Sequence, residues 1–269
     1  MNKGMKVSAA LMVAGLVGGS VAMATTTAHA ATKTSYQSEL HTKGKLMIGL
    51  EGTYAPYSYR TKSGKLTGFE VELSKAVAKK MNLKPVFVET KFDSLIAGLG
   101  AKKYDVIFNN MAATPERKKA YTFAQPYLHT NTVIITKPGS DIKKAADLKG
   151  KRAAQSAGSD FGQTAQRAGA KLVSAPGFAE ALDLVNSGKA DATLNSEDSW
   201  GVYKKKHPET KLQAKVTKVD RESAASPMLN KQNKALAKQV TKVEKQLHKD
   251  GTMKKLSVKY FGKDLTTEK

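Results

Sequence analysis

The feature that most constrains the fold of this chain is a repeated alternation of strand-like and helix-like segments. Strands are predicted from short apolar runs at 45–50, 84–89, 104–109, 131–136, 151–155, 171–174 and 191–195. Helices are predicted between them at 69–81, 94–102, 159–168, 178–187 and 197–206. Because strands joined by helices usually return in the same direction, this order predicts an α/β protein with largely parallel sheets.

Local signals support individual helices. In 69–81 the apolar residues recur at four-residue steps, which is typical of one buried helix face. Asp93 is expected to cap the helix at 94–102 through its carboxylate. The triplet Thr-Pro-Glu at 114–116 predicts the start of a short helix, because proline is favoured in the first turn.

The last third of the chain contains a helix with two unlike faces. Its apolar stripe consists of Leu236, Val240, Val243 and Leu247. A second stripe, roughly 200° away on a helix, consists of Lys234, Lys238, Lys242, Lys245 and Lys249. Two interpretations of the lysine stripe remain open: an ordinary solvated face, or a surface that docks an anion.

The first thirty residues have the pattern of an export signal. A basic start precedes a run of small and apolar residues at 7–24, and 28–30 (Ala-His-Ala) fits the small-x-small rule of signal peptidases. We expect cleavage after Ala30, which leaves residues 31–44 as a tail before the first strand. An uncleaved membrane anchor is the alternative, but glycine, serine and alanine lower the hydrophobicity of this run.

Composition excludes several kinds of site. The 269 residues include no cysteine, which excludes disulfides, thiolate metal sites, a cysteine nucleophile and a lipid-modified cysteine. The five histidines are scattered without helical pairing, so no metal site is expected, and no motif calls for a cofactor.

The chain is strongly basic, with 45 Lys and Arg residues against 23 Asp and Glu and a formal net charge of +22. Residues 1–30 hold two lysines and no acid, so cleavage leaves a charge of +20. Basicity predicts an acidic partner. For an exported protein, anionic cell-wall polymers are a better prediction than nucleic acid.

Five segments resemble the exported substrate-binding proteins of amino-acid ABC importers (solute-binding protein family 3) in content, order and spacing. They lie at 48–81 (beginning IGLEGTYAP), 91–127 (containing TPERKK), 147–152 (DLKGKR), 181–195 (ending ADATLN) and 249–262 (KDGTMKKLSVKYFG). The resemblance covers about 45–262. The opening GLEGTYAP and the triplet RES at 221–223 are most similar to the cystine-binding subgroup.

This resemblance implies a two-lobe fold like that of periplasmic binding proteins, with two hinge strands and a ligand held between the lobes. Lobe 1 is expected at 45–131 and 222–269, and lobe 2 at 136–217. The lobes would close on the ligand by a hinge motion. The membrane subunits of an ABC permease would then bind the closed form, and the protein is expected to be a monomer.

Arg117 is the expected partner of a ligand carboxylate. A zwitterion that leaves water needs a cationic fork for its carboxylate and acceptors for its ammonium group. Arg117 lies in TPERKK, where the resemblance places a ligand-binding arginine. Asn110 and Ala112 are implied to contact the same end of the ligand, Ala112 through its N–H alone. Without the resemblance, an exposed arginine paired with Glu116 would be the simpler interpretation.

Three aromatic residues and one acid are expected around the ligand side chain. The resemblance matches Tyr54 and Phe92 to two rings that enclose the ligand, and Tyr57 lies close by in the sequence. Glu51, at the end of the first strand, could accept an ammonium group. The alternative is that the rings belong to the core and that Glu51 is a surface carboxylate.

In lobe 2, Ser159 and Asp160 lie in a turn that resembles the anion-binding Gly-x-Thr turn of the family. The Asp160 carboxylate would repel a ligand carboxylate unless it points away. A plain helix N-cap would explain the same residues equally well.

The chain departs from the family at Ser196. The resemblance implies an Asp at this position that binds the α-ammonium, five residues after Asp191, but the sequence has Ser196. Either Ser196 acts with a neighbouring acid, Glu197 or Asp198, or specificity has changed.

Three functions compete on these grounds. The first is a binding protein for an imported amino acid, with L-cystine preferred. The second is a basic adhesin held by charge on envelope polymers or host matrix, which is compatible with the first. It would be extracellular on a one-membrane cell, and the alternative location is the periplasm. The third is an enzyme, since this fold also hosts a dehydratase; no motif singles out a catalytic acid, so no enzyme is expected.

Overall fold

The computed structural model describes residues 35–219 and 224–267. The expected signal peptide at 1–30 and the triplet at 221–223 lie outside the described residues. Within the described ranges, no helix is both long and apolar enough to cross a membrane.

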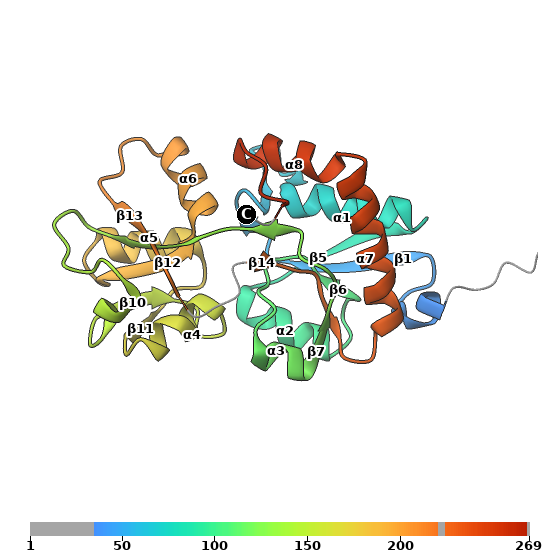
Figure 1. Cartoon of the computed structure of the whole chain (residues 1–269), viewed down its shortest axis with the longest axis horizontal. Coiled ribbons are helices and arrows are strands. Elements are labelled where there is room, and N and C mark those ends of the chain that lie inside the picture. The colour runs from blue at the N-terminus through green and yellow to red at the C-terminus, as the bar shows by residue number, and fades with distance from the viewer. Residues whose placement is uncertain (1–34, 220–223, 268–269) are drawn as a thin grey trace, which may run out of the picture. The chain divides into compact units, whose positions relative to one another are not determined.

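Lobe 1 is built on a five-stranded sheet (Figure 1). The order of its strands is β5 (Lys84–Glu89), β1 (Lys45–Leu50), β6 (Val106–Ile107), β15 (Met228–Asn230) and β7 (Tyr121–Phe123). Strand β1 is parallel to β5 and β6, whereas β15 is antiparallel to both of its neighbours. The C-terminal part of the chain therefore completes a sheet begun by the N-terminal part.

Helices cover both faces of this sheet. One face carries α1 (Phe69–Lys80), α7 (Lys234–Lys249) and α8 (Thr252–Phe261), which pack against one another. The other carries α2 (Phe92–Gly100), and the short α3 (Pro115–Ala120) lies beside β7. A three-stranded meander follows β1 and consists of β2 (Thr53–Tyr54), β3 (Ser58–Arg60) and β4 (Leu66–Thr67).

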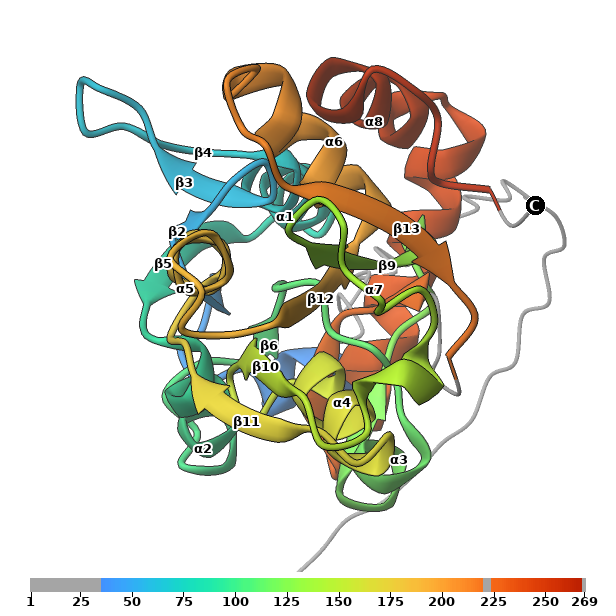
Figure 2. The same ribbon diagram turned by 90° about the vertical axis from the view of Figure 1, so that its left-hand side faces the viewer.

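Lobe 2 repeats the plan around a second sheet (Figure 2). Its strand order is β11 (Lys171–Ser174), β10 (Arg152–Gln155), β12 (Ala192–Ser196), β9 (Thr132–Thr136) and β13 (Gln213–Thr217). Its helices are α4 (Asp160–Arg167), α5 (Phe178–Asn186) and α6 (Glu197–Lys206). One apolar cluster lies under α5 and α6 and another under α4, so both faces of this sheet are covered as well.

The chain passes between the two sheets twice. Strands β8 (Leu128–His129) and β14 (Ala224–Ala225) pair antiparallel where the two crossings meet lobe 1. Two short 3₁₀ helices, η1 (Ser35–Glu39) and η2 (Ala145–Leu148), complete the described elements. The expected α/β fold with two lobes and two hinge strands is thus observed.

The sheets are largely parallel, as predicted, with one exception in each: β15 in lobe 1 and β9 in lobe 2 run against the other four strands. One detail differs from the sequence prediction. Asp93 is not the cap of α2, since the N-cap is Lys91 and the helix begins at Phe92. The Asp93 carboxylate instead accepts a hydrogen bond from the Ser156 hydroxyl of lobe 2.

Candidate functional site

A cavity lies between the lobes, at the carboxyl ends of parallel strands in both sheets, which is the usual ligand position in open α/β sheets. It encloses about 550 Å³ of atom-free space including its open mouth, within the range of small-molecule sites. Its lining residues are Glu51, Tyr54, Phe92, Asn109, Asn110, Gln155, Ser156, Ser159, Asp160, Phe161, Ala175, Pro176, Gly177, Phe178, Ala181, Thr193 and Asn195.

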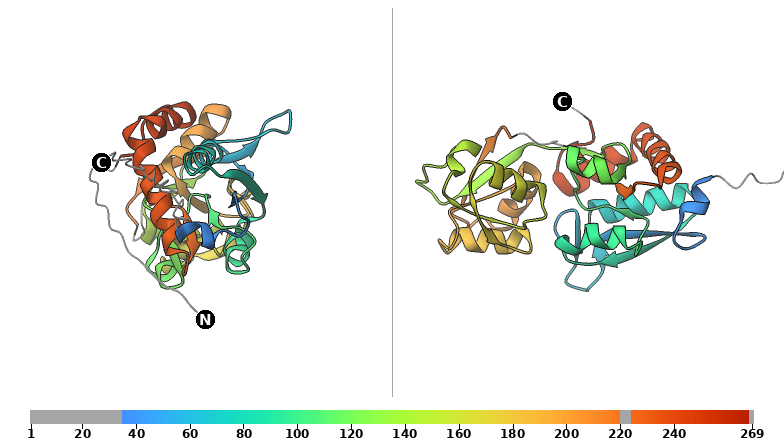
Figure 3. Two further views of the ribbon diagram at one scale, coloured as in Figure 1. Left: turned by 90° about the vertical axis from the view of Figure 1, so that its right-hand side faces the viewer. Right: turned by 90° about the horizontal axis from the view of Figure 1, so that it is seen from below.

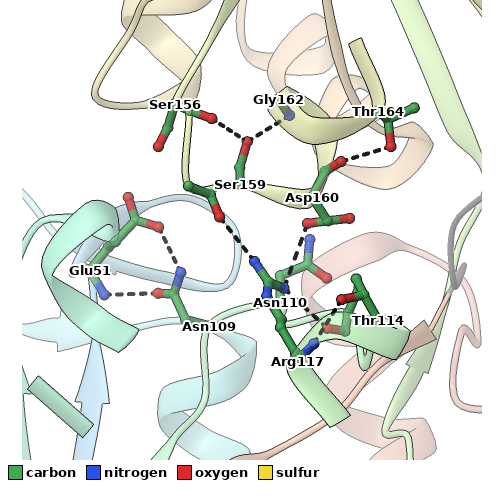
Figure 4. Close-up of polar contacts among 12 residues, drawn as sticks. Glu51, Asn109, Asn110, Thr114, Arg117, Ser156, Ser159, Asp160, Gly162 and Thr164 are labelled. Carbon is green, nitrogen blue, oxygen red and sulfur yellow. Dashed lines mark hydrogen bonds and ion pairs between the residues drawn. The ribbon is translucent and has the colours of Figure 1, made fainter. Parts of the chain in front are cut away.

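Glu51 is held at the end of β1 by a reciprocal pair with Asn109. The Glu51 N–H donates to Asn109 Oδ1 at 2.8 Å, and Asn109 Nδ2 donates to Glu51 Oε2 at 2.7 Å (Figure 4). Burial raises the pKa of Glu51 to about 7, partly offset by the Asn109 hydrogen bond. The nearby carboxylates of Asp93 and Glu180 raise that pKa further. An ammonium group placed here would favour the ionised form.

Asn110 is positioned by a carboxyl group in the core of lobe 1. It has a φ of 47°, and its N–H donates to Glu70 Oε1 at 2.5 Å. The Tyr127 hydroxyl donates to the same oxygen at 2.5 Å. Burial raises the pKa of Glu70 to about 8. The left-handed turn at Asn110, which directs its side chain to the cavity wall, is therefore fixed from behind by Glu70.

Arg117 connects the two lobes behind the cavity. Its Nη1 donates to the Ala112 carbonyl at 3.0 Å, and its Nη2 donates to the Gly158 carbonyl of lobe 2 at 3.2 Å. Thr114 caps α3 and accepts from the Arg117 N–H at 3.2 Å. The guanidinium is 6% exposed, so it does not form the exposed pair with Glu116 that a lone arginine would suggest.

Ser159 and Asp160 form the first turn of α4. Ser159 is the N-cap, and its hydroxyl accepts from the Gly162 N–H at 2.9 Å while donating to the Ser156 carbonyl at 2.7 Å. Asp160 is the first helical residue and is 5% exposed. One of its carboxylate oxygens lies 4.0 Å from Arg117 Nη1, and Figure 4 shows the two groups facing each other.

Aromatic rings from both lobes line the cavity. Tyr54 and Phe92 come from lobe 1, as expected from the sequence. Phe178 of α5 meets Tyr54 edge to face, with ring centroids 6.5 Å apart. The Tyr54 hydroxyl donates to Asn195 Oδ1 of lobe 2 at 2.7 Å, which holds the ring in place across the cavity.

Tyr57 does not line the cavity, contrary to expectation, because its side chain is fully buried. Its hydroxyl donates to the Asp198 carboxylate and lies 3.0 Å from the Ser196 hydroxyl. Asp198 also accepts from the Thr130 hydroxyl at the crossing between lobes. Burial raises the pKa of Asp198 above its ordinary value. These residues form a closed polar cluster beside the cavity.

Four other expected site residues also lie outside the lining. Ala112 is buried and uses its carbonyl for Arg117. Arg117 is behind the wall, and Ser196 is fully buried in the polar cluster. Glu197 accepts from Asn131 Nδ2 at 2.8 Å in an exposed pair instead of turning inward. The described residues contain no group of acids and histidines suited to a metal ion.

A family model for bacterial extracellular solute-binding proteins, family 3, matches residues 46–263. The chain belongs to this family. Among curated relatives, a probable amino-acid ABC transporter-binding protein of Haemophilus influenzae is 42% identical over 222 residues, covering 82% of this chain and 86% of the relative. The L-cystine-binding protein TcyA of Bacillus subtilis is 37% identical over 226 residues, covering 83% and 84%.

Solved structures of the family share the fold. An ancestral arginine-binding protein bound to arginine superimposes with a TM-score of 0.76 at 33% identity, covering 82% of this chain and all of that one.

Sequence reasoning missed much of the lobe 2 wall of this solute-binding protein. The segment 175–178, which follows β11, contributes three small residues and Phe178. Its position after a strand was the only available signal, because small and apolar residues carry no chemical signature. Gln155, Thr193 and Asn195 were missed for a related reason: they lie on or at the end of strands whose pairing the sequence does not state.

Proposed function

We propose that this chain is the substrate-binding protein of an amino-acid ABC importer and that L-cystine is its ligand. The observation that carries the proposal is a single cavity that combines aromatic walls with carboxylates from both lobes, Glu51 and Asp160. Cystine has an ammonium group at each end and an apolar disulfide between them. Rings such as Tyr54 and Phe92 suit that disulfide, since each sulfur–aromatic contact contributes roughly 0.3–1.5 kcal/mol.

The relatives support an amino-acid ligand and leave a choice between cystine and a basic amino acid such as arginine. TcyA is an L-cystine-binding protein, whereas the ancestral structure holds arginine. Arginine also carries two cationic groups, so it is the strongest competitor at a cavity lined by two acids. The family is one of solute-binding proteins, which supports binding over catalysis as the role of this cavity.

Isothermal titration of the purified protein with cystine, arginine and the other standard amino acids tests this proposal. Cystine is expected to bind more tightly than arginine, and cysteine, which offers only one ammonium group, is expected to bind more weakly than either. Tighter binding of arginine would reassign the ligand. No heat and no thermal shift with any amino acid would overturn the importer function.

We further propose that the protein is exported, with cleavage after Ala30. The support is the basic start and small apolar run described above, together with the extracellular character of the family. Mass spectrometry of the protein recovered outside the cell is expected to show a chain that begins at Ala31. A chain that retains residues 1–30 would favour a membrane anchor.

We also propose that the lysine stripe of α7 helps to hold the protein on anionic cell-wall polymers. Its five lysines, residues 234, 238, 242, 245 and 249, are all exposed. Helix α7 lies on the side of lobe 1 that faces away from lobe 2 (Figure 3), so docking there would leave the cavity open to its ligand. Salt at about 1–2 M screens such contacts strongly and is expected to release the protein from intact cells.

A matched pair of variants distinguishes retention by the lysine stripe from retention by total charge. One variant replaces the five stripe lysines by glutamine; the other replaces five exposed lysines elsewhere, at 62, 65, 103, 204 and 205. Both lose the same charge, but the stripe variant is expected to be released at a clearly lower salt concentration. Equal release would mean that net charge, and not α7, retains the protein.

A further inference from the structure

The structure leaves the ligand ammonium without its expected partner. Ser196, which occupies the position where the sequence resemblance called for an acid, is fully buried. Its hydroxyl lies 3.0 Å from the Tyr57 hydroxyl and 2.6 Å from the Ser199 hydroxyl. Ser196 and Asp198 both belong to this closed cluster and do not line the cavity. An ammonium group in the cavity must therefore be bound by another acid.

Asp160 lines the cavity and has the required chemistry. It is 5% exposed, and its carboxylate faces Arg117, whose Nη1 lies 4.0 Å away (Figure 4). It also occupies the first turn of α4, where backbone N–H groups favour negative charge. A guanidinium and a helix N-terminus thus both favour negative charge at this position.

The Asp160 carboxylate suits the ammonium group of an amino acid. Asp160 lines the cavity, whereas the Arg117 guanidinium lies behind the wall, so a ligand ammonium that meets Asp160 gains a charged partner in a site with little water. A ligand with a carboxylate but no ammonium would bring its negative charge close to Asp160 without compensation.

We propose that Asp160 binds the α-ammonium of the ligand in this protein, in place of the acid absent at position 196. The inference rests on the proposed function, because it requires an amino-acid ligand in the same cavity. It assigns Asp160 the opposite role to the anion-binding turn suggested by the sequence. Arg117, behind the cavity wall, then serves as the counter-ion of Asp160.

The test compares ligands that differ in one group. Cystine is compared with 3,3′-dithiodipropionate, which keeps the disulfide and both carboxylates but lacks both ammonium groups. The wild-type protein is expected to prefer cystine. In Asp160→Asn, a near-isosteric change, cystine affinity is expected to fall roughly 10- to 150-fold, the range for a lost charged hydrogen bond. Affinity for dithiodipropionate is expected to stay level or rise, so the variant is expected to lose the preference for cystine over dithiodipropionate.

Ser196→Ala is the matched control at the position where the acid was expected. It is expected to keep the wild-type ratio of cystine to dithiodipropionate affinity, even if both affinities change. If Asp160→Asn keeps that ratio, or if Ser196→Ala abolishes it, the assignment of Asp160 is overturned while the importer function stands. If the wild-type protein binds no amino acid, both proposals fall.

A measurement on the unchanged protein covers the case in which Asp160→Asn does not fold. A crystal structure of the wild-type protein with cystine, or with the amino acid that titration identifies, is expected to show an α-ammonium within hydrogen-bond distance of the Asp160 carboxylate. An ammonium bound elsewhere, with no contact to the Asp160 carboxylate, would overturn the inference.

Discussion

At the scale of single residues, the site depends on three carboxyl groups that lie in different surroundings. Glu51 lines the cavity with a pKa raised to about 7, and Glu70 supports Asn110 from the core with a pKa raised to about 8. Asp160 faces a guanidinium 4.0 Å away. The cavity of a protein with a formal charge of +22 is thus lined by acids, which favours ligands rich in ammonium groups.

The raised pKa of Glu51 predicts that ligand binding depends on pH. A ligand ammonium stabilises the ionised carboxylate, whose fraction falls as the pH drops through about 7. Affinity for a ligand whose ammonium contacts Glu51 is therefore expected to decrease by up to about tenfold per pH unit below 7 and to level off above it. Titrations between pH 5.5 and 8 check this. Glu51→Gln is expected to flatten the curve; an unchanged slope in that variant would assign the effect to another group.

At the scale of elements, a close backbone contact between Gly162 and Ser156 sets the position of α4 at the cavity wall. A Cβ on Gly162 would lie 2.3 Å from the Ser156 carbonyl oxygen, so the helix can approach the preceding turn only with glycine here. That approach places the Ser159 cap and Asp160 at the cavity wall.

Gly162→Ala is accordingly expected to lower stability by roughly 1–3 kcal/mol and to weaken ligand binding, because the first turn of α4 must move away. Gly201→Ala is the control, since that glycine is also helical and nothing lies within 4 Å of its added Cβ. This second change is expected to be neutral or stabilising by up to about 1 kcal/mol. Thermal unfolding and titration measure both effects, and equal results for the two variants would contradict the argument.

Helix α7 contains a buried carboxyl group that lowers the stability of the fold. Glu244 is fully buried on its inner face, and neither carboxyl oxygen has a hydrogen-bond partner within the described ranges. Burial raises its pKa well above the ordinary value. Above a pH of about 4.5 the unfolded chain loses this proton while the folded chain keeps it, so the free energy of unfolding decreases as the pH rises.

Glu244→Met is expected to raise the free energy of unfolding by roughly 1–3 kcal/mol near neutral pH, because it removes an unsatisfied buried polar group. The gain is expected to be larger at pH 8 than at pH 4, since the pH-dependent loss disappears with the carboxyl group. Denaturant unfolding at both pH values measures it. A variant less stable than the wild type would show that a bound water or ion satisfies Glu244.

At the scale of the whole molecule, several hydrogen bonds join the lobes around the cavity. Ser156 donates to Asp93, Arg117 to the Gly158 carbonyl, Tyr54 to Asn195 and Tyr57 to Asp198. Each links a group of lobe 1 to a group of lobe 2, so the described conformation is closed. The polar cluster of Tyr57, Ser196 and Asp198 contributes to closure without contacting the ligand cavity.

Tyr57→Phe is therefore expected to favour opening. The change keeps the buried ring but removes the hydroxyl that donates to Asp198, at a cost of roughly 1–3 kcal/mol to the closed form. Ligand dissociation is expected to accelerate by about tenfold or more, which stopped-flow fluorescence can follow, because the closed state retains the ligand. Tyr59→Phe serves as control, since its ring keeps its contact with Lys206 Nζ at 5.0 Å. Equal dissociation rates in the two variants would show that the cluster plays no part in closure.

Local pattern was sufficient to predict most of the elements. The helical period at 69–81 corresponds to α1, and the apolar run at 45–50 to β1, because the side chains that face a core repeat with the period of the element itself. The predicted strand at 104–109 shortened to Val106–Ile107, and Asn109, beyond its carboxyl end, lines the cavity. In lobe 1, Glu51, Tyr54, Phe92 and Asn110, which were predicted to bind the ligand, lie in the cavity lining.

The sequence by itself thus determined the alternation of elements, the absence of cysteine chemistry, the basic surface of α7 and the lobe 1 acids and rings of the site. Only the tertiary structure decided that Tyr57 and Ser196 form an internal cluster, that Phe178 completes the wall, and that Asp160 faces Arg117. The physical reason is distance along the chain. Periodicity and capping act between neighbours, whereas these contacts join residues separated by tens of positions and exist only after two sheets have brought them together.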